Sequence, residues 1–493
     1  FGARWHWVEE AGSAERDGYV AQVEEILAGE LPSDPYRPAF YPLATAALAR
    51  CGLSPFTAAR LLSGAAAAAL AALAFFFGRR LAGTPAGWFA FTATAVNPNL
   101  WILGQHVTTD MPFAALAAAA LAAAFAYLER PGWRPALAAG AALGLAAFTR
   151  ANALFLLPPL AVAWWLAPAA GRRVRHLVAT VATAVALFVP HLVLRAAVFG
   201  DPLHDENWKN LAFKLHGFPD WSYLDRVPYD GLADVVLSDP AAVVAGFASE
   251  LWRFLAGGGL AQLVGTPLHA LLLVVGAALA LAAPATRRRA AWLLFAAATF
   301  LAAVAATFFA WGRLLLCLLP IANALAFAPW GREVRAGLRG WPRGRWVGPV
   351  LATVAVAAVS VLAVKTAFFR LPEFVVHHPY AEVEVLRGLA GQTPPGTALA
   401  GTSPFLGRYL DRPYVYVDDA FGSEVDEPER WYAATRERLA SEGAAYLVVG
   451  AVDLRDRPPA LLAPEPPVEW LEAAGGDGRV RVWRVVEAPP NPP

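Results

Sequence analysis

The chain has 493 residues, of which 57% are hydrophobic and only 16% are charged, and its formal net charge is +1. Soluble domains carry about 25% charged residues, so the shortfall predicts that most of this chain lies in lipid. A net charge this close to zero implies no acidic polymer as partner, and the sequence holds no nucleic-acid-binding motif. The two cysteines, Cys51 and Cys317, lie far apart and predict neither a disulfide framework nor a cysteine metal site.

Residues 1–56 form a polar stretch that ends at the first long apolar run. Within it, ERDGYVAQVEEI predicts a short helix near Asp17 and Tyr19, and FYPL at 40–43 contains Tyr41. Asp17 is either a solvated acidic residue or a general base that removes the proton of an acceptor hydroxyl.

Ten apolar segments qualify, or nearly qualify, as membrane spans, each of which needs about 20 mostly apolar residues. Those at 134–149 and 152–167 are short, and their Ala and Gly content favours tilted or partly buried helices that pack closely. The ten are roughly 57–81, 85–104, 111–128, 134–149, 152–167, 176–198, 262–283, 290–309, 313–330 and 346–366.

Arginines cluster in alternate loops between these segments, and the positive-inside rule makes those loops cytoplasmic. The clusters lie at 79–80, 130–134, 172–175, 287–289 and 332–345. The extracytoplasmic side then holds residues 1–56, the turns near 97–110, 150–152 and 310–313, the loop 199–261 and the C-terminal segment. This topology places every candidate site residue on the extracytoplasmic side of the cytoplasmic membrane.

The loop 199–261 carries Lys209 and several aromatic residues, among them Trp221 and Trp252. Aromatic residues of this kind often lie along a membrane interface, so we expect interfacial helices there. Beyond the last predicted span, short apolar runs alternate with helical patterns. This alternation predicts a small extracytoplasmic α/β domain over residues 367–493, with a partly parallel sheet.

Asp110 stands in TTDMPF at the start of an apolar segment. Either Thr109 or Asp110 is the N-cap of that helix, with Pro112 in its first turn. Alternatively, Asp110 takes part in chemistry at the same end of the bundle as Asp17, because a carboxylate at this depth is costly unless it has a chemical role or caps a helix. His106, four residues earlier, either shares that pocket or is an interfacial histidine.

Arg150 and Arg313 are isolated arginines at the extracytoplasmic ends of predicted spans, against the positive-inside trend. Each is either a side chain that snorkels to the interface or a phosphate ligand, since the planar guanidinium can bind two phosphate oxygens at once. Lys209 is either solvated or adds charge to the same phosphate site. The histidines lack the spacing of a structural zinc site, and no catalytic metal is expected.

The order of these features resembles the glycosyltransferases of the GT-C membrane fold that use polyprenyl-phosphate sugars, the group of the protein O-mannosyltransferases (family 39) and the aminoarabinose transferases of lipid A. The resemblance covers nearly the whole membrane part, roughly residues 4–366, in which Asp17, Tyr19 and Tyr41 match the order of an acid, an aromatic residue and the entry to the next span. It implies a polytopic helical catalytic domain of about ten spans, or about eleven with a first helix preceding this chain. Gly18 stands where many relatives carry a second acid.

This resemblance implies that a sugar moves, with inversion, from a polyprenyl-phosphate donor to a hydroxyl of a protein, lipid or glycan acceptor outside the membrane. It implies no cofactor, although some oligosaccharide transferases of the same broad fold use a divalent ion on paired acids. The implied roles are catalytic for Asp17 and Asp110, donor-phosphate binding for Arg313, Arg150 and Lys209, and substrate binding for Tyr19, His106 and Tyr41.

Two other classes of protein stay open at this point. One is a transferase of larger glycans, such as an oligosaccharide or O-antigen ligase. The other is a non-enzymatic membrane transporter or sensor. Transporters usually show repeated halves with ionisable groups at mid-membrane, whereas this sequence shows no internal repeat and its ionisable residues cluster toward one face.

Overall fold

The computed structural model describes two compact units of the chain. The first unit takes in the described residues of 19–208 and 239–370, and the second takes in those of 209–238 and 381–486. The described residues are 19–32, 34, 37–168, 173–216, 229–310, 312–331, 344–370, 381–401, 410, 412–417, 428–450, 461, 463–476 and 480–486.

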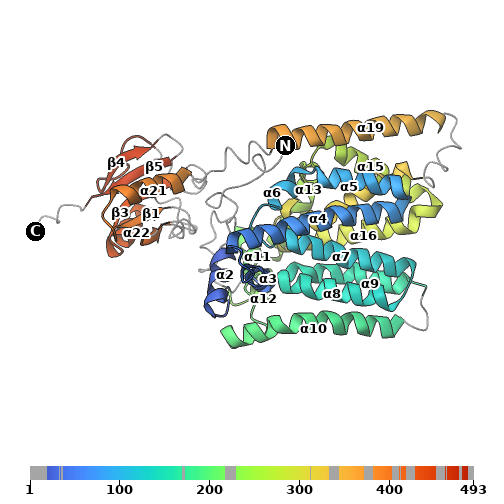
Figure 1. Ribbon diagram of the computed structural model, residues 1–493, viewed down its shortest axis with the longest axis horizontal. Coiled ribbons are helices and arrows are strands. Elements are labelled where there is room, and N and C mark those ends of the chain that lie inside the picture. The colour runs from blue at the N-terminus through green and yellow to red at the C-terminus, as the bar shows by residue number, and fades with distance from the viewer. Residues whose placement is uncertain are drawn as a thin grey trace, which may run out of the picture. The chain divides into compact units, whose positions relative to one another are not determined.

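The first unit is a helical bundle whose long helices run nearly parallel to one another (Figure 1). Its first half contains α2 (Tyr19–Ala28), α3 (Phe40–Ala49), α4 (Pro55–Ala82), α5 (Thr84–Ala95), α6 (Pro98–Leu103), α7 (Asp110–Glu129), α8 (Trp133–Thr149), the 3-10 helix η1 (Ala151–Leu156), α9 (Leu157–Leu166) and α10 (Arg173–Phe199). Its second half contains α13 (Pro240–Leu255), α14 (Gly259–Val264), α15 (Pro267–Ala282), α16 (Pro284–Thr307), the 3-10 helices η3 (Gly312–Leu318) and η4 (Ala328–Trp330) around α17 (Leu319–Ala326), and α19 (Gly344–Lys365) with a π-helical turn η5 (Thr366–Arg370).

Several helices begin at a hydroxyl or carboxyl side chain followed by proline. The Ser54 hydroxyl accepts a hydrogen bond from the Thr57 amide at 3.2 Å at the start of α4, and Thr266 accepts one from the His269 amide at 3.1 Å at the start of α15. These caps satisfy backbone donors that have no partner within the helix, and the proline that follows has no N–H to lose.

Among the described residues, five helical segments are long and apolar enough to cross a membrane: α4, α7, α10, α16 and the run Gly312–Trp330. Shorter apolar helices accompany them, including α15. The predicted span 85–104 is divided, because α5 ends at Ala95 and the Asn97 side chain then caps α6 by accepting from the Asn99 amide. The predicted count of ten spans therefore stays a prediction.

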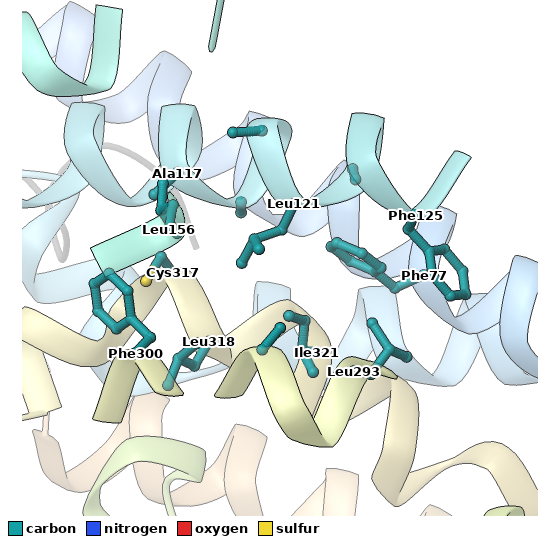
Figure 2. Packing of buried hydrophobic residues seen from close by; sticks show 14 of the residues in the cluster. Phe77, Ala117, Leu121, Phe125, Leu156, Leu293, Phe300, Cys317, Leu318 and Ile321 are labelled. Atoms are coloured by element: carbon teal, nitrogen blue, oxygen red, sulfur yellow. The ribbon is translucent and has the colours of Figure 1, made fainter. Parts of the chain in front are cut away.

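The core of the bundle is built from α4, α7, α16 and the η3–α17 run (Figure 2). Phe125 of α7 contacts Phe77 of α4 and Trp292 of α16, with ring centroids 5.9 and 5.7 Å away. Ile321 and Leu318 face α7 from the other side (Figure 2). By contrast, α10 leaves most of its apolar side chains exposed, as expected of a helix that faces lipid.

Glycine lets two helices of the bundle approach closely. A Cβ built on Gly276 of α15 would lie 2.2 Å from the carbonyl oxygen of Leu325 and 2.7 Å from that of Ala326. A Cβ on Gly64 of α4 would lie 3.8 Å from the carbonyl oxygen of Gly104, which is ordinary contact. Both glycines lie inside helices, but only Gly276 has no space for a methyl group.

We expect Gly276→Ala to destabilise the bundle by about 1–3 kcal/mol, because the added methyl group overpacks the contact of α15 with α17. The matched variant Gly64→Ala should be neutral or stabilise by up to about 1 kcal/mol, because alanine favours the helix. Thermal unfolding of the detergent-solubilised protein measures both. Equal midpoints for the two variants would contradict the close packing at Gly276.

Each end of α7 has an acidic residue that pairs with arginine. At its last residue, Glu129 pairs with Arg80 of α4 and Arg289 of α16, each at 2.8 Å. At its first residue, Asp110 pairs with Arg150. A helix of this length rises roughly 30 Å, so the predicted cytoplasmic arginines near Glu129 and the candidate site residues near Asp110 lie at opposite ends of the bundle.

The second unit contains a five-stranded mixed sheet of order β2-β1-β3-β5-β4. Strand β1 pairs in parallel with β2 and β3, and β5 pairs antiparallel with β3 and β4, so the sheet is partly parallel as predicted. The elements are α11 (Lys209–His216), α12 (Leu232–Ser238), α21 (Ala381–Gln392), β1 (Ala398–Gly401), β2 (Tyr414–Tyr416), α22 (Pro428–Ser441), β3 (Ala444–Gly450), β4 (Leu471–Gly476) and β5 (Val480–Val485).

The alternation of side chains along the strands gives this sheet two apolar faces. Leu447 and Trp483 belong to one buried cluster, which also contains Leu439 of α22. Leu399 and Val448 belong to another, with Leu386 of α21. Each face therefore has a helix against it.

Two aromatic residues of the loop 199–261 were predicted to lie along a membrane interface. Trp221 lies outside the described residues, and Trp252 is exposed on α13.

Candidate active site

Asp110 is the buried acid at the start of α7, where 2% of it is exposed. The Thr108 hydroxyl donates to its Oδ2 at 3.0 Å and in turn accepts from the Asp110 amide at 2.9 Å. The N-cap residue, Thr109, makes no capping hydrogen bond with its side chain. Asp110 is therefore the first residue of α7 and not its N-cap, and its carboxylate is held by the side chains of other residues.

Two arginines from separate segments act on the Asp110 carboxylate. Arg150 follows α8 in an extended conformation, and its Nη1 donates to Asp110 Oδ1. Its guanidinium also lies over the ring of Phe113, 5.9 Å from the centroid. Arg313 lies in η3, which packs against α7, and attracts the same carboxylate electrostatically. Of the two isolated arginines of the sequence, Arg150 thus pairs with Asp110, and the charge of Arg313 acts on the same acid.

Tyr19 and Tyr41 connect the start of the chain to this acid. The Tyr19 hydroxyl lies 3.0 Å from the Thr109 hydroxyl, next to Asp110, and is buried. The Tyr19 and Tyr41 rings meet edge to face, with centroids 5.3 Å apart. The Tyr41 hydroxyl donates to the Ala59 carbonyl of α4 at 3.1 Å. Tyr41 thus anchors α3 to α4, while Tyr19 contacts the site more directly.

The remaining sequence candidates have different positions. His106 lies partly exposed in the turn between α6 and α7. Lys209 is the first residue of α11 and belongs to the second unit, whereas Asp110 belongs to the first. Asp17 lies outside the described residues, two positions before Tyr19. Within the described ranges, no three His, Cys, Asp or Glu side chains are grouped to hold a metal ion.

The sequence analysis did not predict a polar network that lies next to Tyr19. Asp34 binds the Arg37 guanidinium at 2.8 Å and accepts from the Gln22 amide group at 3.0 Å. The Arg37 guanidinium lies over the Tyr19 ring, and Arg195 of α10 donates to the Asp34 carbonyl at 2.6 Å. Arg195 lies inside the predicted span 176–198, so the signal that identified Arg150 and Arg313, an isolated arginine at the end of a span, did not single it out.

Comparison with known proteins gives one family and several structures. The family model described as dolichyl-phosphate-mannose-protein mannosyltransferase matches residues 37–194, roughly a third of the chain, including Asp110 and Arg150. No curated protein matches the sequence.

The similar solved structures are membrane glycosyltransferases. ArnT from Cupriavidus metallidurans in the apo state is 17% identical, with a TM-score of 0.54, and the match covers 97% of this chain and 94% of ArnT. The same protein bound to undecaprenyl phosphate is 16% identical, with a TM-score of 0.56 and the same coverage. The Archaeoglobus fulgidus oligosaccharyltransferase tethered with an acceptor peptide is 12% identical, with a TM-score of 0.55, and the match covers 90% of this chain and 66% of that one.

At these identities the likenesses show the fold. The chain has the GT-C membrane fold, as the sequence predicted. The family model and this fold together indicate a membrane glycosyltransferase.

Removing Arg150 from the ion pair should destabilise the bundle, because the buried Asp110 carboxylate then loses a cation. We expect Arg150→Gln to cost about 2–3 kcal/mol, less than for a fully buried pair, since Arg150 is 25% exposed. Adding Asp110→Asn should recover about 1–2 kcal/mol of that loss. Thermal unfolding of the unchanged protein, Arg150→Gln and the double variant measures these differences in stability.

Arg134→Gln is the matched control, because Arg134 is exposed in the first turn of the same helix, α8. It should change stability by less than about 0.5 kcal/mol. If Arg150→Gln proves as mild as Arg134→Gln, the ion pair contributes little and the assignment of Asp110 as its anchor is wrong.

Proposed function

We propose that the chain is an integral membrane glycosyltransferase that moves a sugar from a polyprenyl-phosphate donor to an acceptor hydroxyl on the extracytoplasmic side of the cytoplasmic membrane. The observation that carries the proposal is the Arg150–Asp110 ion pair at one end of the bundle, with Arg313 close enough for its charge to act on the same carboxylate. Its setting in the fold of ArnT, which has been solved with undecaprenyl phosphate, supports a lipid phosphate as the ligand.

The charges at this site favour an anion. Two guanidinium groups act on one carboxylate, so the three side chains carry a net positive charge. Asp110 is buried, whereas Arg150 and Arg313 are partly exposed. In this arrangement Asp110 fixes the orientation of Arg150, and both arginines offer donors to the oxygens of a phosphate.

In the proposed reaction the acceptor oxygen attacks the anomeric carbon of the donor sugar, and the bond from that carbon to the phosphate oxygen breaks. Negative charge grows on the departing polyprenyl phosphate, and the fixed charges of Arg313 and Arg150 stabilise it. A single displacement of this kind inverts the anomeric centre.

The acceptor proton goes to a carboxylate base, for which we propose Asp17. Tyr19, two residues later, contacts Thr109 beside Asp110, which supports a role for this part of the chain at the site. Tyr19 and His106 are proposed to line the substrate site, and Lys209 is kept as a further candidate for the donor phosphate.

We expect Arg313→Ala to lower kcat/KM for a short-chain polyprenyl-phosphate sugar about 100-fold, because charge stabilisation of the leaving phosphate is lost. The kcat/KM of Arg313→Lys should lie between those of the unchanged protein and Arg313→Ala, since lysine keeps the charge but lacks the planar fork. Arg50→Ala, an exposed arginine after α3, is the control and should leave turnover unchanged. Transfer in nanodiscs, with and without a metal chelator, measures these effects. Full activity of Arg313→Ala would overturn the phosphate assignment.

Asp17→Asn should lower kcat about 100- to 10,000-fold with little change in donor binding, because the amide cannot accept the acceptor proton. The control Glu30→Gln changes an exposed acid after α2 in the same part of the chain and should keep full activity. The stereochemistry of the product, read by NMR, should be inverted. Retained configuration would refute the single displacement, and activity that survives Asp17→Asn would refute this base.

A further inference from the structure

Glu250 is a buried acid of α13 that the reaction described above does not use. Only 8% of the residue is exposed, although it belongs to a helix with several exposed apolar side chains. Its Oε2 accepts a hydrogen bond from the Ala310 backbone amide at 2.8 Å, and the same oxygen pairs with Arg253, one turn further along α13. A buried carboxylate held in this way ties two segments that are 60 residues apart in sequence.

The backbone that Glu250 holds leads directly to Arg313. Helix α16 ends at Thr307, Phe308 is extended, and η3 begins at Gly312. The Ala310 amide therefore lies outside both helices, three positions before Arg313, and Ala310 itself is buried. A buried backbone amide needs an acceptor, and Glu250 supplies it at the point where the chain turns toward the site.

The ion pair with Arg253 makes this tether firm. Arg253 is about half exposed, whereas the Glu250 side chain is only 10% exposed, so the arginine reaches in from the surface to balance the buried charge. An ionised acceptor forms a shorter and stronger hydrogen bond with an amide than a neutral one does. With both partners on one oxygen, the carboxylate cannot rotate without losing both contacts.

We infer that Glu250 is a positioning residue for Arg313: its carboxylate fixes the start of η3 and thereby sets where the Arg313 guanidinium meets the donor phosphate. This inference rests on the proposed function. It differs from a purely structural role because the effect of Glu250 on the substrate must pass through Arg313. A displacement of about 1 Å at a binding group can cost a factor of about 100 in rate, so the tether has a measurable consequence.

The test is a double-mutant cycle between Glu250 and Arg313. In the otherwise unchanged protein, Glu250→Ala should weaken binding of a short-chain polyprenyl phosphate about 10-fold and lower kcat/KM by about 10- to 100-fold. In the Arg313→Ala background the same substitution should change both by less than about 2-fold. Glu250→Gln should recover only part of the loss, because it keeps an oxygen acceptor for Ala310 but loses the charge that pairs with Arg253.

Two further variants guard against a folding defect. Glu250→Met fills the same space without an acceptor and should reproduce the losses of Glu250→Ala in protein that elutes as a single species. Ser249→Ala, the exposed neighbour on α13, should leave binding and turnover unchanged.

The possible results separate this inference from the function on which it rests. The positioning role is wrong if Glu250→Ala lowers binding and kcat/KM by the same factor with and without Arg313. It is also wrong if folded Glu250→Ala and Glu250→Met show no loss. In either case, donor binding by the unchanged protein still upholds the proposed function. If the unchanged protein neither binds polyprenyl phosphate nor transfers sugar, the proposed function is wrong and the inference is wrong with it.

Discussion

The structure of the site follows from one constraint, the high free energy of a buried carboxylate without partners. Inside a bundle that excludes water, an ionised acid must be paired and hydrogen-bonded. Asp110 meets this demand with Arg150 on one oxygen and Thr108 on the other, and with the charge of Arg313 nearby. These partners come from the turn before α7, the end of α8 and η3, so satisfying one carboxylate brings three segments together.

The same constraint has a different result at the other end of α7. Glu129 gives one oxygen to Arg80 and the other to Arg289, each at 2.8 Å, and so joins α4, α7 and α16. There, arginine occupies both carboxylate oxygens. At Asp110, a threonine occupies one oxygen, and the second cation acts through space. The Glu129 contacts thus join three helices, whereas the Asp110 end is the one proposed to bind the donor phosphate.

The sequence predicted the parts of the site that break a statistical rule. Arg150 and Arg313 were identifiable because an arginine at that end of a span opposes the positive-inside trend. Arg195 did not stand out in this way, because it lies inside the predicted span 176–198 and also inside α10, which continues to Phe199.

Contacts between distant segments could not be predicted in the same way. Nothing near Glu250 in the sequence points to Ala310, and nothing near Asp34 points to Arg195, because a single sequence carries no record of long-range pairs. The partly parallel sheet was predictable from alternating patterns, yet strand β4, with the sequence LEAAGG, has neither β-branched nor aromatic residues to mark it. Its pairing with β5 supplies what its own sequence lacks.

Both candidate phosphate ligands lie where regular α-helix is interrupted. Arg150 is extended between α8 and η1, and Arg313 lies in a 3-10 helix after the break that follows α16. Irregular backbone at membrane depth is tolerated only where protein or a lined cavity satisfies its polar groups. Each break therefore frees a side chain to turn toward the site and also creates backbone groups that need partners. Glu250 meets that need before Arg313, and this contact is the route by which we propose that it positions Arg313.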